Sequence, residues 1–152
     1  MPDDPANDAK ARAAAIQASL SREQCYVLMM RPNPDAPPMP RPAEEMRIVH
    51  HEYLLDLERR GVLFGAGPFV DETGNRVGAG MIIIRAANRS EAESIGLAEP
   101  YTAAGQRLME FIPWQRNEGS VRINLRFADG VLEVDRRTYR LVKTDQDRTP
   151  GK

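Results

Sequence analysis

The strongest constraint on the fold is a regular alternation of strand-like and helix-like patterns between residues 24 and 114. Short apolar runs favour buried strands, whereas apolar residues that recur every three or four positions favour amphipathic helices. The patterns follow one another in the order strand, helix, strand, strand, helix, strand. The predicted elements are Cys25–Met30, Glu44–Arg60, Val62–Phe64, Met81–Ile84, the segment from Ser90 to before Pro100, and Leu108–Ile112.

This order predicts an α+β, ferredoxin-like domain (βαββαβ), in which two helices cover one face of a four-stranded antiparallel sheet. The other face of the sheet then needs a cover, because an apolar sheet face is stable only when it is buried. Association of two copies is a common solution for a domain of this size. We therefore expect a homodimer.

Local signals set the ends of these elements. The first helix carries glutamates in its first turn and arginines in its last turn, as the helix dipole favours, and Gly61 follows as the expected stop. Ser90 and Glu93 have the spacing of a capping box, which predicts the start of the second helix. We expect Pro68 and Pro113 to end the second and the fourth strand, since proline cannot donate a ladder hydrogen bond.

Two extensions flank this domain. We expect an N-terminal polar and helical extension at 1–22, the ferredoxin-like domain at 23–114, and a C-terminal β-hairpin extension with a flexible tail at 115–152. The N-terminal helix is predicted to begin at Pro5, with Asp4 as its cap. In the C-terminal extension the expected features are alternating apolar residues from Val121 to Phe127, a turn at Asp129–Gly130, and strands at Val131–Val134 and Tyr139–Val142.

Composition narrows the expected partners and location. The chain has 152 residues and a formal net charge of −1, which gives no electrostatic reason to expect nucleic acid or an anionic membrane as a partner. No run approaches the roughly 20 apolar residues of a membrane span. The first residues are acidic and lack an apolar run, so we expect no secretory signal and a cytoplasmic protein. The single cysteine, Cys25, excludes a disulfide framework.

The only two histidines of the chain, His50 and His51, lie side by side in the first predicted helix. On a helical wheel His50 falls within the apolar stripe, whereas His51 points away from it. An inward imidazole beside the glycine-rich segment Gly65–Pro68 is a candidate for acid–base chemistry. The alternative is a core histidine that a backbone carbonyl holds. Adjacent helical residues diverge and cannot chelate one ion together, so we expect no metal site.

Several short motifs support a resemblance when their order and spacing are taken together. His50 precedes Gly61 by eleven residues, and Gly65-Ala66-Gly67-Pro68 follows. Further along are the strand with Gly78, Ala98-Glu99-Pro100-Tyr101, Ala104-Gly105 and Pro113-Trp114. With these motifs, the segment from about 24 to 114 resembles the YciI-like (YCII-related) family. The resemblance implies a dimeric ferredoxin-like fold with a His–Asp dyad in a small-molecule cleft, and a relationship to muconolactone isomerases and chloromuconolactone dehalogenases.

The sequence departs from the family pattern at two positions. Glu99 replaces the aspartate of the dyad, and Ala79 stands where a serine is often found. Glutamate keeps the carboxylate but places it one methylene further from the backbone. Carried over to this chain, the resemblance makes His50 and Glu99 the catalytic candidates. The candidates for substrate binding, near these two residues or at the mouth of the cleft, are Tyr53, Gly67, Pro68, Tyr101 and Arg41.

The chemistry of a His–Glu pair suggests one class of function. A carboxylate that accepts one ring N–H fixes the imidazole tautomer, so the other ring nitrogen can move a proton on a bound small molecule. Such a pair suits isomerisation, elimination or dehalogenation of a small organic acid or lactone, without a cofactor. The alternatives are a non-catalytic small-molecule-binding or accessory module, and a purely structural role in which the extensions serve assembly.

Overall fold

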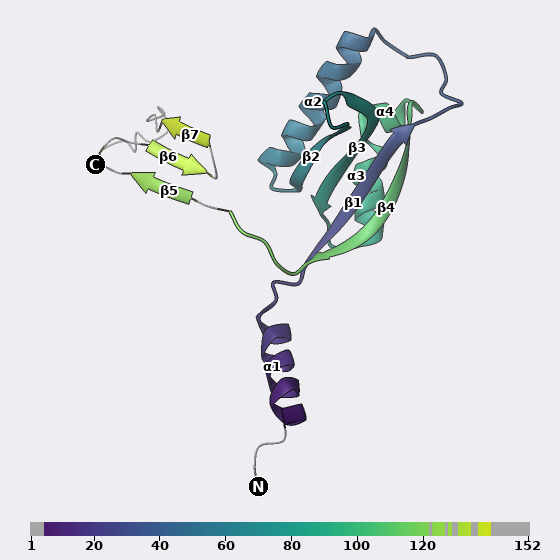
Figure 1. The fold of residues 1–152 in the computed structure, drawn as a ribbon. Helices are drawn as coiled ribbons and strands as arrows, with labels where there is room; N and C mark the ends of the chain where they lie inside the picture. The colour runs from purple at the N-terminus through teal and green to yellow at the C-terminus, as the bar shows by residue number, and fades with distance from the viewer. Residues whose placement is uncertain (1–4, 122, 127, 129–130, 135–136, 141–152) are drawn as a thin grey trace, which may run out of the picture. The chain divides into compact units, whose positions relative to one another are not determined.

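A computed structural model describes residues 5–121, 123–126, 128, 131–134 and 137–140 of the chain (Figure 1). The chain divides into two compact units, Met1–Asn117 and Glu118–Lys152. Each unit is described by itself below.

Four strands of the first unit lie side by side in one antiparallel sheet (Figure 1). Their order across the sheet is β2-β3-β1-β4, so β2 and β4 are the edge strands. The expected mixed α/β architecture with a four-stranded antiparallel sheet is confirmed. The strands are β1 (Glu23–Pro32), β2 (Leu63–Val70), β3 (Arg76–Arg85) and β4 (Arg107–Arg116).

Two helices of the first unit cover the same face of this sheet. They are α2 (Ala43–Arg59) and α3 (Arg89–Leu97), and the short helix α4 (Pro100–Ala103) follows α3. Leu54 of α2 and Ile95 of α3 pack against one buried cluster, which consists of Tyr26, Leu28, Met30, Ile82, Ile84, Ala86 and Ala92.

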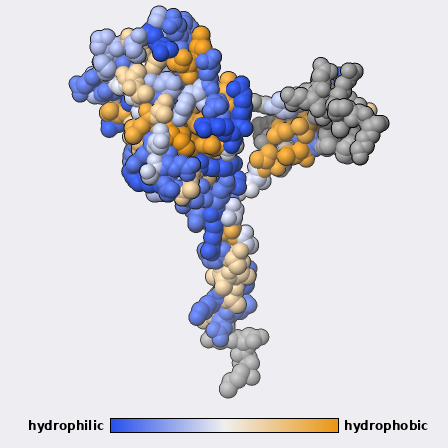
Figure 2. Space-filling view, turned by 180° about the vertical axis from the view of Figure 1, so that it is seen from behind, coloured by the Kyte–Doolittle hydropathy of each residue, from blue (hydrophilic) through white to orange (hydrophobic). Residues whose placement is uncertain are grey.

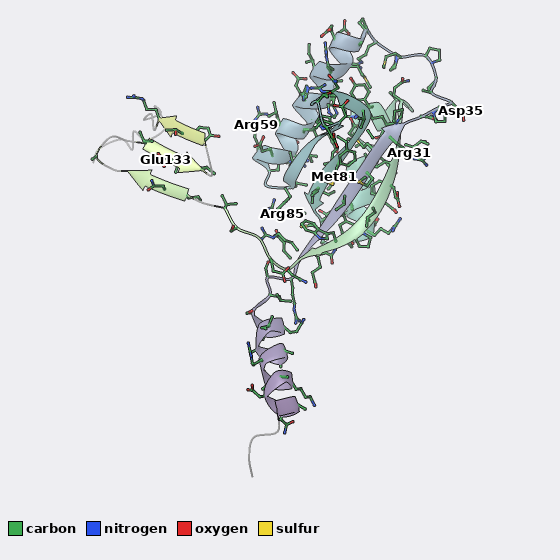
Figure 3. The ribbon with its side chains drawn as sticks, viewed as in Figure 1. Arg31, Asp35, Arg59, Met81, Arg85 and Glu133 are labelled. Atoms are coloured by element: carbon green, nitrogen blue, oxygen red, sulfur yellow. The ribbon has the colours of Figure 1, made fainter. Side chains whose placement is uncertain are left out.

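The opposite face of the sheet carries apolar side chains that are only half-buried. Because successive side chains of a strand point to opposite faces, Val27 and Met29 of β1 point away from the buried cluster. Met81 of β3 pairs with Met29 and lies on the same uncovered face (Figure 3).

The helix ends follow local chemistry, with one correction. Gly61, just after α2, has the positive φ of 71° that favours glycine, as expected. The second helix, however, begins earlier than predicted. Its cap is Asn88, whose side chain accepts a hydrogen bond from the Glu91 amide, while the Glu91 carboxylate accepts one from the Ala87 amide. The capping pair, Asn88 and Glu91, therefore lies two residues before the predicted pair of Ser90 and Glu93.

The expectation that two prolines end their strands is wrong. β2 continues through Pro68 to Val70, and β4 continues through Pro113 to Arg116. Pro68 pairs with Gly80 and Pro113 pairs with Tyr26. Both prolines lie on edge strands, where an amide on the outer side needs no partner in the ladder, so the missing N–H costs little.

The helix layer approaches the sheet closely at Gly96 of α3. A methyl group at this position would lie 2.5 Å from Cε1 of Phe111, so only glycine allows this contact without movement. The hydroxyl of Tyr53 on α2 donates a hydrogen bond of 2.7 Å to the carbonyl oxygen of Ile95 on α3. This bond joins the two helices, and Gly96 sets how near to β4 they lie.

The N-terminal helix α1 (Pro5–Ser19) begins at the predicted residue, while its predicted cap Asp4 lies outside the described residues. Its described side chains are exposed, including Ile16, and Figure 2 shows hydrophilic residues along much of its surface. Within the described part of the chain, no helix is long and apolar enough to cross a membrane.

The second unit contains a separate three-stranded antiparallel sheet of order β5-β6-β7. Two of its strands agree with the predicted hairpin, and the third begins at Arg137, before the predicted strand start at Tyr139. The predicted turn at Asp129–Gly130 lies outside the described residues, as do Phe127 and Val142. The strands are β5 (Ile123–Arg126), β6 (Val131–Val134) and β7 (Arg137–Arg140).

Candidate active site

A cavity of about 290 Å³ lies between α2 and the sheet, near the carboxyl end of β1. Residues of α2 form one wall, residues of all four strands form the floor, and Tyr101 of α4 closes one side. The lining residues are Met30, Arg47, His50, His51, Leu54, Ala66, Gly67, Pro68, Arg76, Gly78, Ala79, Gly80, Ile82, Tyr101 and Arg107.

Small residues of β2 and β3 leave the space for this cavity. Gly78 has a φ of 82°, a backbone conformation that side chains with a Cβ rarely adopt. A Cβ at Gly80 would lie 2.9 Å from the carbonyl oxygen of Gly67, so the two strands require glycine at this point. Ala66, Gly67 and Pro68 of the glycine-rich segment therefore form part of the cavity floor.

Glu99 is a fully buried carboxylate that caps α4. Pro100 occupies the first turn, where its missing N–H is not needed. Glu99 Oε1 accepts a hydrogen bond of 3.0 Å from the Tyr101 amide. Its Oε2 accepts bonds of 2.9 Å from the amide and 2.8 Å from the hydroxyl of Thr102. The remaining partner is the His50 ring, whose Nδ1 lies 2.7 Å from Oε1.

The electrostatics of Glu99 decide which ring nitrogen of His50 carries the proton. Burial acts to raise the pKa of this carboxyl, but the hydrogen bonds from His50, Tyr101 and Thr102 outweigh it and hold the pKa below its ordinary value of 4.5. Glu99 is therefore ionised at neutral pH and can only accept hydrogen bonds. It follows that Nδ1 of His50 carries the hydrogen. Among the described residues, Nε2 has no hydrogen-bond partner.

His50 lies at the boundary between the protein interior and the cavity. Its side chain is 12% exposed, and the edge of its ring packs against Tyr101 with 5.2 Å between the ring centroids. The ring is therefore held on one side by Glu99 and on another by Tyr101. This arrangement can present Nε2 to a small molecule in the cavity without losing the orientation of the ring.

His51 is exposed and lies on the flank of α2 with Glu44 and Arg47, in agreement with the prediction that it points away from the apolar stripe. His51 lines the same cavity, and its ring centroid lies 5.1 Å from that of His50. The cavity extends from beneath α2 to its flank, so it meets two neighbouring rows of side chains. Arg47 lies three residues before His50 and four before His51, and residues at these spacings share one side of a helix.

The structure brings together five of the seven predicted site residues. His50, Gly67, Pro68 and Tyr101 line the cavity, and Glu99 lies directly behind His50. Two predicted substrate-binding residues do not line it. Tyr53 faces α3 through its bond to Ile95, and burial raises the pKa of its hydroxyl. Arg41 is exposed in the segment before α2.

Sequence reasoning missed three arginines in the cavity wall, Arg47, Arg76 and Arg107. Arg47 could have been found, because it lies one helical turn before the two histidines. Arg76 and Arg107 carry no local signal. They begin β3 and β4, and the two strands flank β1 only because of the sheet order β3-β1-β4.

Among the described residues, no three His, Cys, Asp or Glu side chains lie close enough together to hold a metal ion. A comparison with protein families matches residues 25–115, more than half of the 152 residues, to the YCII-related domain. No curated protein matches the chain.

Proposed function

Because this chain belongs to the YCII-related domain family, we propose that it is an enzyme that moves a proton on a small organic acid or lactone without a cofactor. His50 is the catalytic residue, and Glu99 is the positioning residue that orients it. One observation carries the proposal. The imidazole that lines the cavity is held from behind by an ionised carboxylate at 2.7 Å, which leaves Nε2 available.

The pair can act as a general base and then as a general acid. Nε2 takes a proton from a carbon next to a carbonyl group, and the imidazolium that forms is stabilised by the negative charge of Glu99. Return of the proton to another carbon gives isomerisation. Loss of a leaving group from the neighbouring carbon gives elimination, as in a dehalogenation. Neither route needs a covalent bond to the protein.

Three predicted substrate-binding residues retain that role in the proposal. Gly67, Pro68 and Tyr101 line the cavity around His50. Tyr53 acts indirectly, because its hydrogen bond to Ile95 fixes α2, and with it the height of His50 above the sheet. Arg41 has no part in the proposed mechanism.

The proposal extends to assembly. We propose that the domain at 23–114 has the ferredoxin-like topology and forms a homodimer through the half-buried face with Val27, Met29 and Met81. The extensions at 1–22 and 115–152 then lie outside the catalytic domain. Light scattering at micromolar concentration tests the dimer. A Met81→Glu variant is expected to be monomeric, and a wild-type protein that is monomeric at that concentration would contradict the assembly.

Proton transfer can be tested before the substrate is known. Small organic acids and lactones are screened in heavy water, and NMR detects exchange of hydrogens next to the carbonyl group. Wild-type protein is expected to accelerate this exchange for ligands that also raise its melting temperature. A His50→Ala variant, which removes the proton carrier, is expected to lose the acceleration.

Two outcomes would count against the proposal. Exchange that is as fast in His50→Ala as in the wild type would remove His50 from the chemistry. Ligands that stabilise the fold but show no exchange would favour the alternative, a non-catalytic small-molecule-binding module. A Glu99→Gln variant separates positioning from catalysis. It is expected to slow exchange and change its pH profile while ligand binding persists.

A further inference from the structure

We propose that the cavity selects a small dicarboxylate, and that Arg76 and Arg107 each bind one of its two carboxylate groups. This proposal names the substrate class of the cavity and therefore rests on the function proposed above. It depends on three features of the cavity wall: the sign of its charges, the absence of partners for two of them, and their separation across the sheet.

The charged groups of the cavity wall are all basic. Three arginines and two histidines line it, and among its lining residues in the described part of the chain there is no aspartate or glutamate. Glu99 lies behind His50 and neutralises that ring when it is protonated, so it does not offset the arginines. A wall of this kind attracts anions and repels cations.

Two of the three arginines have no acidic partner. Arg47 forms an ion pair with Glu44 on the same helix. Within the described residues, neither Arg76 nor Arg107 forms an ion pair. Two arginines without an acidic partner among the described residues therefore line one small cavity. Since each matches a carboxylate in a bidentate fashion, a ligand with two carboxylates balances the charge of the site.

Arg107 is already oriented for this task. Its guanidinium carbon lies 4.5 Å from the centroid of the Tyr101 ring, in a cation–π contact. The same ring packs against His50. Tyr101 thus lies between the catalytic imidazole and one carboxylate-binding group, which fixes the position of the ligand relative to Nε2.

The two arginines start from strands on opposite sides of β1. Arg107 pairs with Pro32 of β1, and a Cβ at Gly78 of β3 would contact the Pro32 ring at 3.4 Å from the other side. Neighbouring strands lie about 4.8 Å apart, so the backbones of β3 and β4 lie about 10 Å apart on the two sides of Pro32, and Arg76 lies two residues before Gly78 at the start of β3. Two arginines that start this far apart along the backbone suit two carboxylates at the ends of a short chain better than two oxygens of one phosphate.

The wall between the two arginines suits a hydrocarbon link. Met30, Leu54 and Ile82 supply apolar surface to the cavity. The volume of about 290 Å³ lies at the small end of the range for ligand sites, so the link must be short. Together these features fit a chain of a few carbons with a carboxylate at each end.

The test measures binding by titration calorimetry with succinate, glutarate, adipate and pimelate. The best of these dicarboxylates is compared with its own monomethyl and dimethyl esters, which remove one or both charges and change little else. We expect the dicarboxylate to bind about tenfold or more tightly than its monomethyl ester. Arg76→Gln and Arg107→Gln are each expected to abolish this difference.

Arg59→Gln is the matched control, because Arg59 is an exposed arginine of α2 that does not line the cavity (Figure 3). It is expected to leave all affinities unchanged. The proposal is overturned if none of the dicarboxylates binds, if the monomethyl ester binds as tightly as the diacid, or if inorganic phosphate binds more tightly than any of them. Equal losses in the control and the cavity variants would also overturn it.

A His50→Ala variant separates this proposal from the proposed function. Its cavity keeps both arginines, so we expect it to bind the dicarboxylate with an affinity close to that of the wild type. If the dicarboxylate binds and the wild type shows no proton exchange, the catalytic function fails while the ligand class stands. If exchange is found only with monoacids or lactones, the ligand class fails while the catalytic function stands.

Discussion

The two ends of the sheet use arginine in opposite ways. β3 and β4 each begin and end with an arginine. At the end near the start of β1, Arg85 Nε donates a hydrogen bond of 2.7 Å to Glu23. Arg116 Nη2 lies 2.6 Å from the other oxygen of Glu23, as an ion pair without hydrogen-bond alignment. At the cavity end, Arg76 and Arg107 have no acidic partner among the described residues.

The difference distinguishes arginines whose charge is balanced within the protein from arginines whose charge a ligand would balance. The paired arginines also lie over the Phe64 ring, at 5.1 Å for Arg85 and 5.3 Å for Arg116, so their charge and their surface are both used. The unpaired arginines have no such attraction to an acidic group among the described residues. Their charge is therefore available to the anion that we propose for the cavity.

The largest effect is expected at the buried carboxylate of the cavity end. A Glu99→Ala variant leaves the amide and hydroxyl of Thr102, the Tyr101 amide and the His50 ring without their acceptor. We expect the free energy of unfolding in urea to fall by about 3 kcal/mol. The comparison is Glu23→Ala, where the carboxylate is 26% exposed, and about 1 kcal/mol is expected. Equal losses would show that burial does not distinguish the two ends.

A smaller effect is expected from pH, because acid neutralises the Glu99 carboxylate but leaves its side chain in place. The pKa of Glu99 is lower in the folded chain than its ordinary value of 4.5, so its contribution to stability is fully present above that value. It is lost as the pH falls through the lower folded pKa. Urea unfolding of wild type and Glu99→Gln, from neutral pH to about pH 3, is expected to show a shrinking difference. A constant difference would contradict the lowered pKa.

The smallest effect distinguishes the two kinds of arginine without any ligand. Arg85→Gln removes the bond to Glu23 and is expected to lower the free energy of unfolding by about 1 kcal/mol. Arg107→Gln removes a group with no acidic partner among the described residues, and a change within about 0.5 kcal/mol is expected. Thermal unfolding of both variants in parallel makes the comparison. A larger loss for Arg107→Gln would mean that this side chain supports the fold.

Much of the fold could be predicted because its signals are local. Apolar runs predicted the central strands, and Gly61 predicted the end of α2. The prediction that Pro68 and Pro113 end their strands was wrong, because proline interrupts the hydrogen-bond ladder of an internal strand but is tolerated in an edge strand. Whether a strand lies at an edge depends on the order of the whole sheet, and no short stretch of sequence contains that order.

The site residues also differ in whether a local sequence signal could predict them. The helical wheel identified His50, and the family resemblance supplied Glu99 as its partner. The same wheel correctly placed His51 outside the apolar stripe, but it could not show that the cavity also meets this second row of α2. Arg76 and Arg107 are 31 positions apart and meet only through the sheet, so sequence reasoning could not join them.

The close contact at Gly96 has a consequence for the dimensions of the site. Gly96 does not line the cavity, yet it lets α3 settle against Phe111, and Tyr53 then draws α2 to the same height. The absence of a side chain at Gly96 thus sets the height of the space between α2 and the sheet. Raising the helices by a fraction of an ångström would let the cavity accept a thicker molecule, with no substitution in its walls.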